Sequence, residues 1–267
     1  MTSYRYPREQ ITLIVTVGVI LIAGLLAAGF TVCLLPLAVI VFMGFAYLTN
    51  RSHHQELLRN GKRITPQVSQ ALSAVVDDCQ RKLRPGAVEV FAVPSRELNA
   101  YTFGMEDPKI VVLFGALFRY MDADELRFIL GHELGHVALG HTWLNTLLGG
   151  MAGVPLPYSA AVILVLAFRS WNRMCEYSAD RAGLLACGSL DKAISALVKL
   201  VNKEADTPAE LEEMLALIDQ QDDSVANVLA ESLATHPMIV NRIEQLRVYA
   251  ATSGYQKLQA EVNRRAV

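Results

Sequence analysis

Charged residues are absent from a long stretch near the start of the chain. From Ile11 to Asn50 there is no Asp, Glu, Lys or Arg. A helix of that length would measure about 60 Å, enough for two crossings of a hydrocarbon core about 30 Å thick. The sequence between Gly29 and Pro36 offers a place to turn. Residues 1–50 are therefore predicted to form a transmembrane helical hairpin, with one long tilted helix as the alternative.

Basic residues at both ends of this stretch predict its orientation. None lies in the turn, and the flanks contain Arg5, Arg8, Arg51, Arg59, Lys62 and Arg63. Because basic residues are enriched on the cytoplasmic side of membrane helices, both ends of the hairpin are expected to face the cytoplasm. The remainder of the chain, residues 51–267, would then form one domain on that side.

After the hairpin the pattern changes from helix to strand. Apolar positions recur at helical spacing across residues 65–83, and Pro85-Gly86 ends this run. Three stretches rich in β-branched and aromatic residues follow, at residues 88–92, 99–104 and 110–114. The predicted fold class is mainly α with a small antiparallel β-sheet. Such a sheet could only pack the helices, or its edge strand could hold an extended peptide.

A helix is predicted to begin at Asp122. The Asp122 side chain can cap this helix, and Glu125, three residues later, completes a capping box. Apolar residues at positions 126, 129 and 130 lie on one face and make the helix amphipathic. The charged residues of its first turns make it too polar to cross a membrane.

The second half of this helix contains the sequence His132-Glu133-Leu134-Gly135-His136. Helical residues four apart differ by about 40° around the axis, so both imidazoles project from one face and can bind one ion. Glu133 can reach a water on that ion without being a ligand. The pattern is typical of a catalytic zinc site with Glu133 as general base, although it also occurs by chance in roughly one chain in a hundred.

A catalytic zinc ion normally takes three protein ligands, so one remains to be found. His141 is the first candidate, but the longer metzincin motif requires a glycine and a histidine at positions that hold Leu139 and Thr142 here. His141 is instead predicted to be a polar residue at the helix end, where the helix dipole favours it.

Glu176 is the better candidate for the third ligand. Glu176 and Asp180 share one helical face, which is unfavourable for two carboxylates unless a cation compensates. A solvated face neutralised by Arg173 and Arg181 is the alternative. Small residues beside this face would let the helix approach the His132 helix closely, namely Ala179, Ala182, Gly183 and Ala186.

These motifs, in this order, resemble the M48 family of zinc metallopeptidases, especially the HtpX-like membrane proteases. The resemblance covers most of the chain from about Arg51 onward. It is carried by Asn99 to Gly104, Ile110 to Leu117, His132 to His136, Glu176 to Gly183, Thr235-His236-Pro237 and Arg242-Ile243.

The resemblance implies a gluzincin-like protease domain that holds one Zn²⁺ through His132, His136 and Glu176. It implies that Asp180 orients a ligating histidine. It also implies that the strand with Asn99, Ala100 and Tyr101 lies beside the cleft and binds substrate.

His236 is a candidate catalytic residue. Pro237 suits the first turn of a helix, so His236 would lie near a helix N-terminus, where its imidazole is favoured in the neutral form. A neutral imidazole can donate a hydrogen bond to a developing oxyanion. A simple helix cap is the alternative for this residue.

A second uncharged segment lies between the histidine motif and Glu176. It runs from Thr142 to Phe168 and contains Pro155 and Pro157. Because ligands on both sides must meet at one ion, this segment must cross the membrane an even number of times or not at all. Each half, about 12 residues, reaches only about 18 Å. Residues 142–170 are predicted to form an apolar hairpin that dips into the bilayer or lies on it.

The predicted function is that of a membrane-anchored zinc endopeptidase. Glu133 would take a proton from the attacking water and pass it to the leaving amine. The expected partners are unfolded or membrane-protein polypeptides and the lipid bilayer of a bacterial inner membrane, and the net charge of −2 gives no reason to expect nucleic acid. The alternative is a membrane-tethered, chaperone-like binding protein whose structural zinc is closed by His141 or Asp180. A prenyl-protein protease would need more membrane spans.

Overall fold

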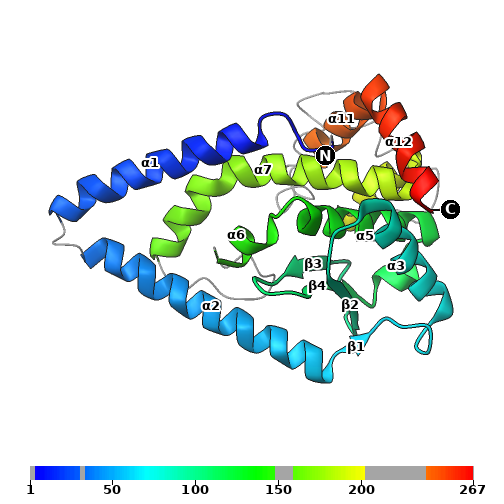
Figure 1. Ribbon diagram of the computed structural model, residues 1–267, viewed down its shortest axis with the longest axis horizontal. Helices are drawn as coiled ribbons and strands as arrows, with labels where there is room; N and C mark the ends of the chain where they lie inside the picture. Colours follow the sequence, from blue (N-terminus) through cyan, green and yellow to red (C-terminus); the bar gives the residue numbers. More distant parts are fainter. Residues whose placement is uncertain (1–3, 31–33, 148–158, 202–238, 267) are drawn as a thin grey trace.

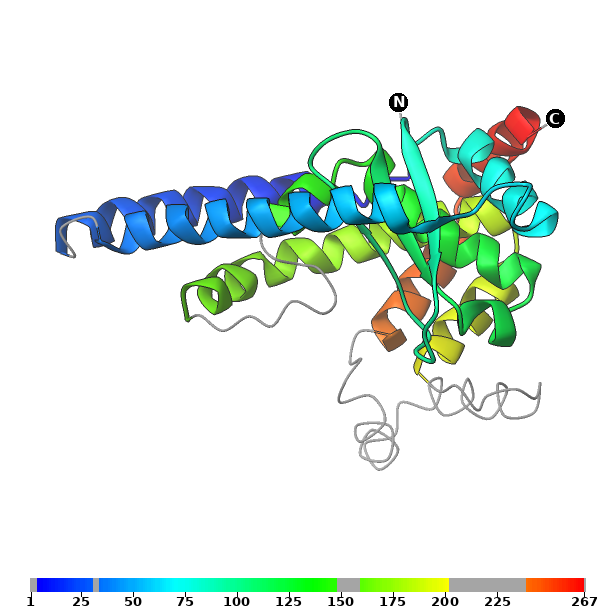
Figure 2. The same ribbon diagram turned by 90° about the horizontal axis from the view of Figure 1, so that it is seen from below.

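Two long helices extend from the body of the protein in the same direction (Figures 1 and 2). The computed structural model describes residues 4–30, 34–147, 159–201 and 239–266. Helix α1 spans Glu9–Phe30 and helix α2 spans Leu34–Asn60, so α2 continues past the predicted domain boundary at residue 50. The predicted turn falls partly on residues 31–33, outside the described part of the chain.

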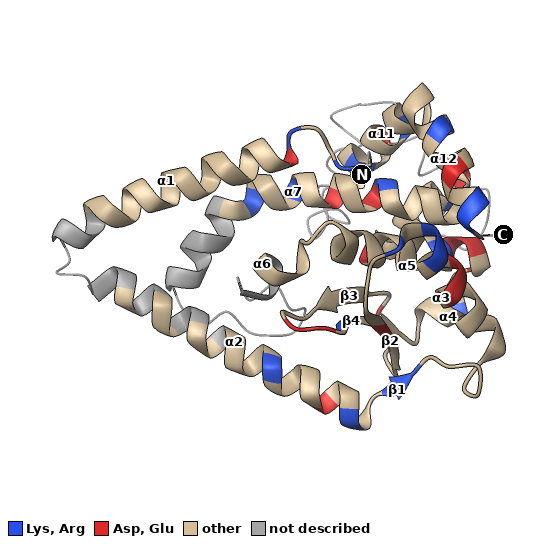
Figure 3. Cartoon of the chain, in the orientation of Figure 1, with Lys and Arg blue, Asp and Glu red and all other residues tan. Residues whose placement is uncertain are grey.

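Many apolar side chains of α1 are exposed on its surface. Leu25 is 76% exposed and Ile14 is 70% exposed. In Figure 3, the coloured part of α1 contains no charged residue after Glu9, whereas charged residues are scattered over the body. Within the described residues, one helix is long and apolar enough to cross a membrane, and it is the Glu9–Leu26 part of α1. Exposed apolar side chains on that helix are suited to lipid rather than water.

The β-sheet is mixed, not antiparallel as predicted. Its strands are β1 (Lys62–Arg63), β2 (Val88–Val93), β3 (Ala100–Phe103) and β4 (Lys109–Phe114). They lie in the order β1-β2-β4-β3, with β4 parallel to β2 and antiparallel to β3. An antiparallel sheet would form if each strand paired with the next one in sequence. Here β4 lies between β2 and β3, so β2 pairs with β4 instead of β3. The apolar run from Ile110 to Phe114 in β4 suits this central, buried position.

The other described helices form the rest of the body. In chain order they are α3 (Gln70–Leu83), α4 (Leu117–Tyr120), α5 (Ala123–Ala138), α6 (Thr142–Leu147), α7 (Ser159–Cys187), α8 (Leu190–Val201), α11 (Ile239–Ala250) and α12 (Ser253–Ala266).

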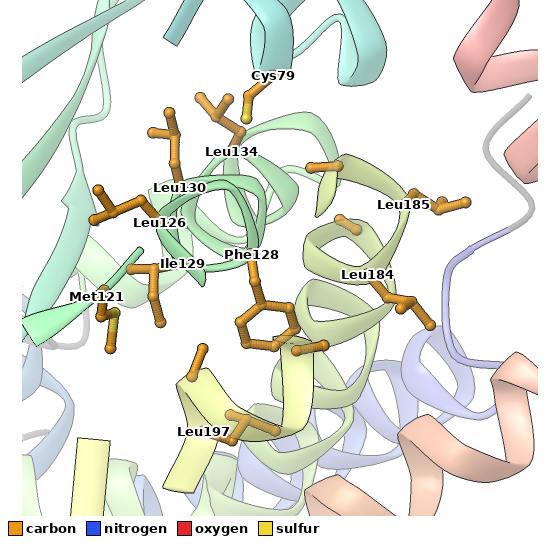
Figure 4. Close-up of a cluster of buried hydrophobic side chains, with 14 of the residues drawn as sticks. Cys79, Met121, Leu126, Phe128, Ile129, Leu130, Leu134, Leu184, Leu185 and Leu197 are labelled. Atoms are coloured by element: carbon orange, nitrogen blue, oxygen red, sulfur yellow. The ribbon is translucent and has the colours of Figure 1, made fainter. Parts of the chain in front are cut away.

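Helix α5 lies at the centre of this body. The predicted capping box is present, because the Asp122 side chain accepts from the Glu125 amide and the Glu125 carboxylate accepts from the Asp122 amide. The helix is not amphipathic as expected, since buried residues extend around it from Glu125 to Val137. Glu125 itself is buried because Lys199 and Ser195 of α8 bind its carboxylate. Figure 4 shows how the apolar side chains of α5 pack between the neighbouring helices.

The predicted close approach of α7 to α5 is confirmed. A β-carbon added to Gly131 would lie 2.4 Å from the β-carbon of Ala186. One added to Gly135 would lie 2.6 Å from the β-carbon of Ala182. Glycine is therefore required on α5 wherever α7 crosses it, and the small residues of α7 let the two backbones meet.

Helix α7 connects the second apolar segment to the polar residues beyond it. It begins at Ser159 and continues without a break through Glu176 to Cys187. Pro155 and Pro157, where the predicted hairpin would turn, lie outside the described residues. The second half of the predicted hairpin and the helix that carries Glu176 are thus one element.

Candidate metal centre

Three side chains from two helices converge on one point. The Nε2 atoms of His132 and His136, both on α5, lie 3.2 Å apart. The carboxylate of Glu176, on α7, lies 3.5 Å from each of them, through Oε2 to His132 and through Oε1 to His136. The close contact between α5 and α7 brings these atoms together although Glu176 lies 40 positions after His136 and 44 after His132.

The size of this triangle fits a zinc ion. Zinc bonds to nitrogen and carboxylate oxygen are about 2.0–2.2 Å long, so two ligand atoms at tetrahedral angles lie about 3.4 Å apart. The three observed separations are all close to that value. Two histidines and one glutamate are also a known donor set of catalytic zinc sites, in which the fourth position stays open. These residues could therefore hold a metal ion.

The ring nitrogen of His132 that faces away from the convergence point, Nδ1 (the outer nitrogen), is held by an acidic partner. His132 Nδ1 donates to Asp180 Oδ1 at 2.9 Å. This leaves Nε2 free to face the point on which the three side chains converge, called the ligand point below. Arg242 of α11 binds the same carboxylate, with Nη2 at 2.6 Å from Oδ1 and Nε at 2.8 Å from Oδ2. Arg242 Nη1 also lies 3.2 Å from Glu176 Oε2. One arginine thus contacts both carboxylates of the face that was predicted to need a cation, and its single positive charge compensates part of their negative charge.

The outer nitrogen of His136 is fixed by a second histidine. His136 Nδ1 lies 2.9 Å from His141 Nδ1, and His141 Nε2 lies 3.0 Å from Glu9 Oε1. His141 follows the end of α5 as predicted, but it is 1% exposed and is held between two side chains rather than by the helix dipole alone.

Glu133 lies beside the triangle and is hydrogen-bonded to the sheet. The hydroxyl of Thr102 on β3 donates to Glu133 Oε2. Burial raises the pKa of Glu133, and the opposing effects of His132 and Thr102 do not cancel that rise. A raised carboxylate pKa favours proton uptake during a reaction.

The charges of the site are arranged to receive a cation. Burial alone would raise the pKa of Asp180, but Arg242 and His132 outweigh burial and lower the pKa to about 2, so Asp180 is ionised. Burial, helped by the neighbouring His132, holds the pKa of His136 well below its usual range. A neutral His136 has a free lone pair for a metal.

The site opens into a cleft of about 630 Å³ between the sheet edge and the helices. The predicted substrate residues Asn99, Ala100 and Tyr101 line it, together with Thr102 of the edge strand β3. Phe168 and Trp171 of α7 lie on another wall. His236 falls outside the described residues, so its predicted place near the site remains a prediction.

Sequence reasoning assigned no role to Thr102, Arg242 or Glu9. Arg242 belongs to the Arg242-Ile243 motif, six residues after His236, and that motif alone gives it no chemical role. Thr102 is one threonine in a β-rich stretch, and no local pattern distinguishes it. Glu9 stands in the sequence just before an uncharged stretch, and nothing in the sequence indicates that the fold buries it.

Two imidazoles and a carboxylate that could hold one metal ion, with a second carboxylate beside an open cleft, are the arrangement of a metallopeptidase. The sequence profile of Peptidase family M48 matches residues 62–158 and 150–250, which together make up more than half of the chain. The chain belongs to this family. With the apolar helix α1, it is a membrane-associated metallopeptidase.

Individual relatives agree with this assignment. The chain is 22% identical over 291 residues to a protein named Protease HtpX homolog from Desulforapulum autotrophicum, covering 97% of this chain and 94% of the relative. It is 29% identical over 195 residues to Protease HtpX of Acinetobacter baumannii, covering 59% of this chain and 64% of the relative. It is 27% identical over 197 residues to the chloroplastic Plastoglobule-localized metallopeptidase 48 of Arabidopsis thaliana, covering 67% and 57%.

Proposed function

We propose that this chain is a zinc endopeptidase that hydrolyses unfolded or membrane-embedded polypeptides at a bacterial inner membrane, with its metal centre on the cytoplasmic side. The observation that carries the proposal is the triangle of His132, His136 and Glu176, whose edges match a tetrahedral zinc site and which lies open to the cleft. The names of the HtpX relatives support the peptidase activity.

Each site residue has a defined task in this proposal. When bound, zinc would lower the pKa of a water molecule and polarise the scissile carbonyl. Glu133 accepts the proton of that water at its carboxylate and delivers it to the leaving amine. Asp180 holds His132 in the tautomer that leaves Nε2 unprotonated. His236, if it reaches the cleft, would donate a hydrogen bond to the oxyanion.

The substrate is proposed to bind as an additional strand. β3 is an edge strand of the sheet, and it borders the cleft over Ala100, Tyr101 and Thr102. Main-chain pairing with Asn99 and the residues after it would hold an extended peptide with little dependence on its side chains. Such binding suits unfolded polypeptides, which expose unpaired backbone.

The membrane anchor is proposed to be a hairpin of α1 and α2, with both ends in the cytoplasm. The exposed apolar side chains of α2, including Ile40 and Phe45, support a second span. Cysteines introduced at Trp143 on α6 and at Arg169 on α7 should both react with a membrane-impermeant reagent from the cytoplasmic side. Labelling from opposite sides would contradict this topology, and Glu176 could then not join the two histidines.

The decisive experiment is the variant Glu133→Gln in the full-length chain. It should keep zinc at one ion per chain, while kcat for an unfolded protein substrate falls by about 10²–10⁴-fold because the general base is lost. Glu244→Gln, an exposed glutamate of α11, is the matched control and should cleave normally. Normal cleavage by Glu133→Gln would remove Glu133 from the mechanism. A zinc-free wild-type protein with full activity would refute the zinc dependence.

The alternative of a binding protein with a structural zinc is not favoured by the geometry. A structural site needs a fourth protein ligand, for which His141 and Asp180 were the candidates. Both are already bonded to the outer nitrogens of His136 and His132, on the side away from the ligand point.

A further inference from the structure

The first helix of the membrane anchor reaches into the metal centre. Glu9, at the N-terminus of α1, is 1% exposed although it starts the most apolar helix of the described chain. Its carboxylate is surrounded by hydrogen-bond donors. Oε1 accepts from His141 Nε2 and from Arg5, and Oε2 accepts from the hydroxyl of Ser178 on α7.

The protonation pattern of this chain of contacts follows from the ligand role of His136. If His136 Nε2 faces the metal without a proton, its Nδ1 carries the hydrogen and donates to His141 Nδ1. His141 must then carry its own proton on Nε2, where it donates to the carboxylate of Glu9. Every donor meets one acceptor, so a single arrangement of protons satisfies all three buried groups.

This arrangement parallels the support of the other histidine. His132 is held directly by Asp180, and the positive charge beside that carboxylate comes from Arg242. His136 is held by Glu9 through one intervening imidazole, and the positive charge beside Glu9 comes from Arg5. Carboxylates that orient ligating histidines raise ligand basicity and fix the ring, and their loss typically costs 10- to 100-fold in metal affinity.

We propose that Glu9 is a positioning residue that orients His136 through His141, so that the anchor helix α1 is part of the metal centre. The inference rests on the proposed function, because it assumes that His136 is a zinc ligand. It accounts for the buried charge at the start of α1: as long as Glu9 is seated against His141, which follows α5, and Ser178 of α7, His136 is held in its ligating tautomer.

Packing around Glu9 supports a seated anchor. The Tyr6 amide donates to Ser178 Oγ at 2.8 Å, and Arg5 Nη2 donates to the carbonyl of Leu139 at 2.7 Å. The Arg181 guanidinium lies 4.9 Å from the centre of the Tyr6 ring. The segment before α1 is thus fixed to both helices that supply the metal ligands.

The test measures zinc affinity, with the full-length protein in detergent and a competing chelator. Glu9→Gln keeps the size of the side chain and removes its charge, and His141→Phe breaks the link to His136. Each variant should raise the zinc Kd by about 10- to 100-fold. If Glu9 acts through His141, the double variant should be no worse than His141→Phe alone.

The control separates positioning from stability. Glu125→Gln removes a carboxylate that is buried to the same extent at the other end of α5, where it touches no metal ligand. It should lower the unfolding temperature of the zinc-free protein and leave the zinc Kd within about twofold of wild type. Unfolding temperatures of all zinc-free variants are recorded beside the affinities, and His141→Phe reports the same link if Glu9→Gln does not fold.

The outcomes are distinct. An unchanged zinc Kd in Glu9→Gln, or losses that multiply in the double variant, would overturn the positioning role alone. A second zinc ion that disappears in Cys175→Ser would also overturn it, because Glu9, His141 and Cys175 would then be ligands themselves. A wild-type protein that binds no zinc would overturn the proposed function together with this inference.

Discussion

The hydroxyl of Thr102 donates a hydrogen bond to the carboxylate of Glu133. This contact joins the edge strand β3, where an extended substrate is proposed to bind, to the proposed general base on α5. The same hydroxyl also lies 3.3 Å from the main-chain carbonyl of Glu133. A displacement of the strand would therefore move Glu133, so the proposed substrate binding and the proposed proton transfer would be linked at this point.

Replacing Thr102 by valine tests this link. Valine keeps the branched shape that suits the strand and removes only the hydroxyl. Because hydrogen bonds to charged groups contribute about 1.5–3 kcal/mol, kcat should fall roughly 10- to 100-fold. The zinc content should not change, as measured by metal analysis of the purified variant. Thr102→Ser should restore most of the rate, and a valine variant as fast as wild type would show that Glu133 is positioned without this bond.

Replacing Arg242 by glutamine should harm the zinc-free protein most. Asp180 and Glu176 would lose their shared positive partner, and an uncompensated buried charge costs about 3–5 kcal/mol. Bound zinc supplies positive charge to the same face, so the loss in unfolding free energy should be smaller with zinc than with chelator. Unfolding measured under both conditions, with the exposed Arg119→Gln as control, decides this. Equal losses in both conditions would argue against a metal between these groups.

The Asp122 cap of α5 should make the free energy of unfolding depend on pH in the acidic range. Partial burial alone would raise the pKa of Asp122, but the Glu125 amide and the Lys192 ammonium outweigh it and lower the pKa. A lowered folded-state pKa means that the stabilisation is present above the unfolded pKa of about 3.9, and it is lost as the pH falls through the folded value.

Two substitutions separate the cap from the charge of Asp122. Asp122→Ala should cost about 1 kcal/mol at neutral pH because the hydrogen bonds of the cap are lost. Asp122→Asn should keep most of the cap but lose the acid-dependent part, which unfolding curves at pH 3–7 would reveal. Asp77→Ala, at an exposed site inside α3, should be nearly neutral. An unchanged stability of Asp122→Ala would mean that the cap contributes nothing.

Replacing Gly135 by alanine should separate the two helices of the metal centre. The added β-carbon would lie 2.6 Å from that of Ala182, which two packed backbones cannot accommodate without shifting. Overpacking of this kind costs about 1–3 kcal/mol, and zinc affinity should fall because Glu176 moves away with α7. Gly44→Ala, with nothing within 4 Å of the new carbon, is the control. Wild-type zinc affinity in Gly135→Ala would show that α7 adjusts without moving Glu176.

Features that are encoded locally could be predicted from the sequence. The capping box of Asp122 and Glu125 depends only on residues three apart, and the placement of His132 and His136 on one face depends only on helix geometry. The approach of α7 to α5 was predictable because small residues at helical spacing are a pattern in themselves. The structure brings Glu176 to the two histidines, as the resemblance implied.

Other features arise only from the fold. The parallel pairing of β4 with β2 depends on where β3 lies, and the sequence of β4 does not indicate it. Glu9 meets His141 across 132 positions, and Arg242 meets Asp180 across 62 positions. The sequence does not say which group a single charged residue contacts, so its partner is unknown until the helices are assembled.

Because α7 is continuous, it fixes the distance between Glu176 and the end of the uncharged segment. Phe168 is the last residue of the uncharged segment, and Glu176 follows eight positions later on the same helix. At 1.5 Å per residue, the ligand lies about 12 Å along the helix from the end of that segment. An extended peptide covers about 12 Å with three or four residues. For the proposed membrane-protein substrates, the bond within reach would be only a few residues beyond the point where the substrate itself leaves the lipid.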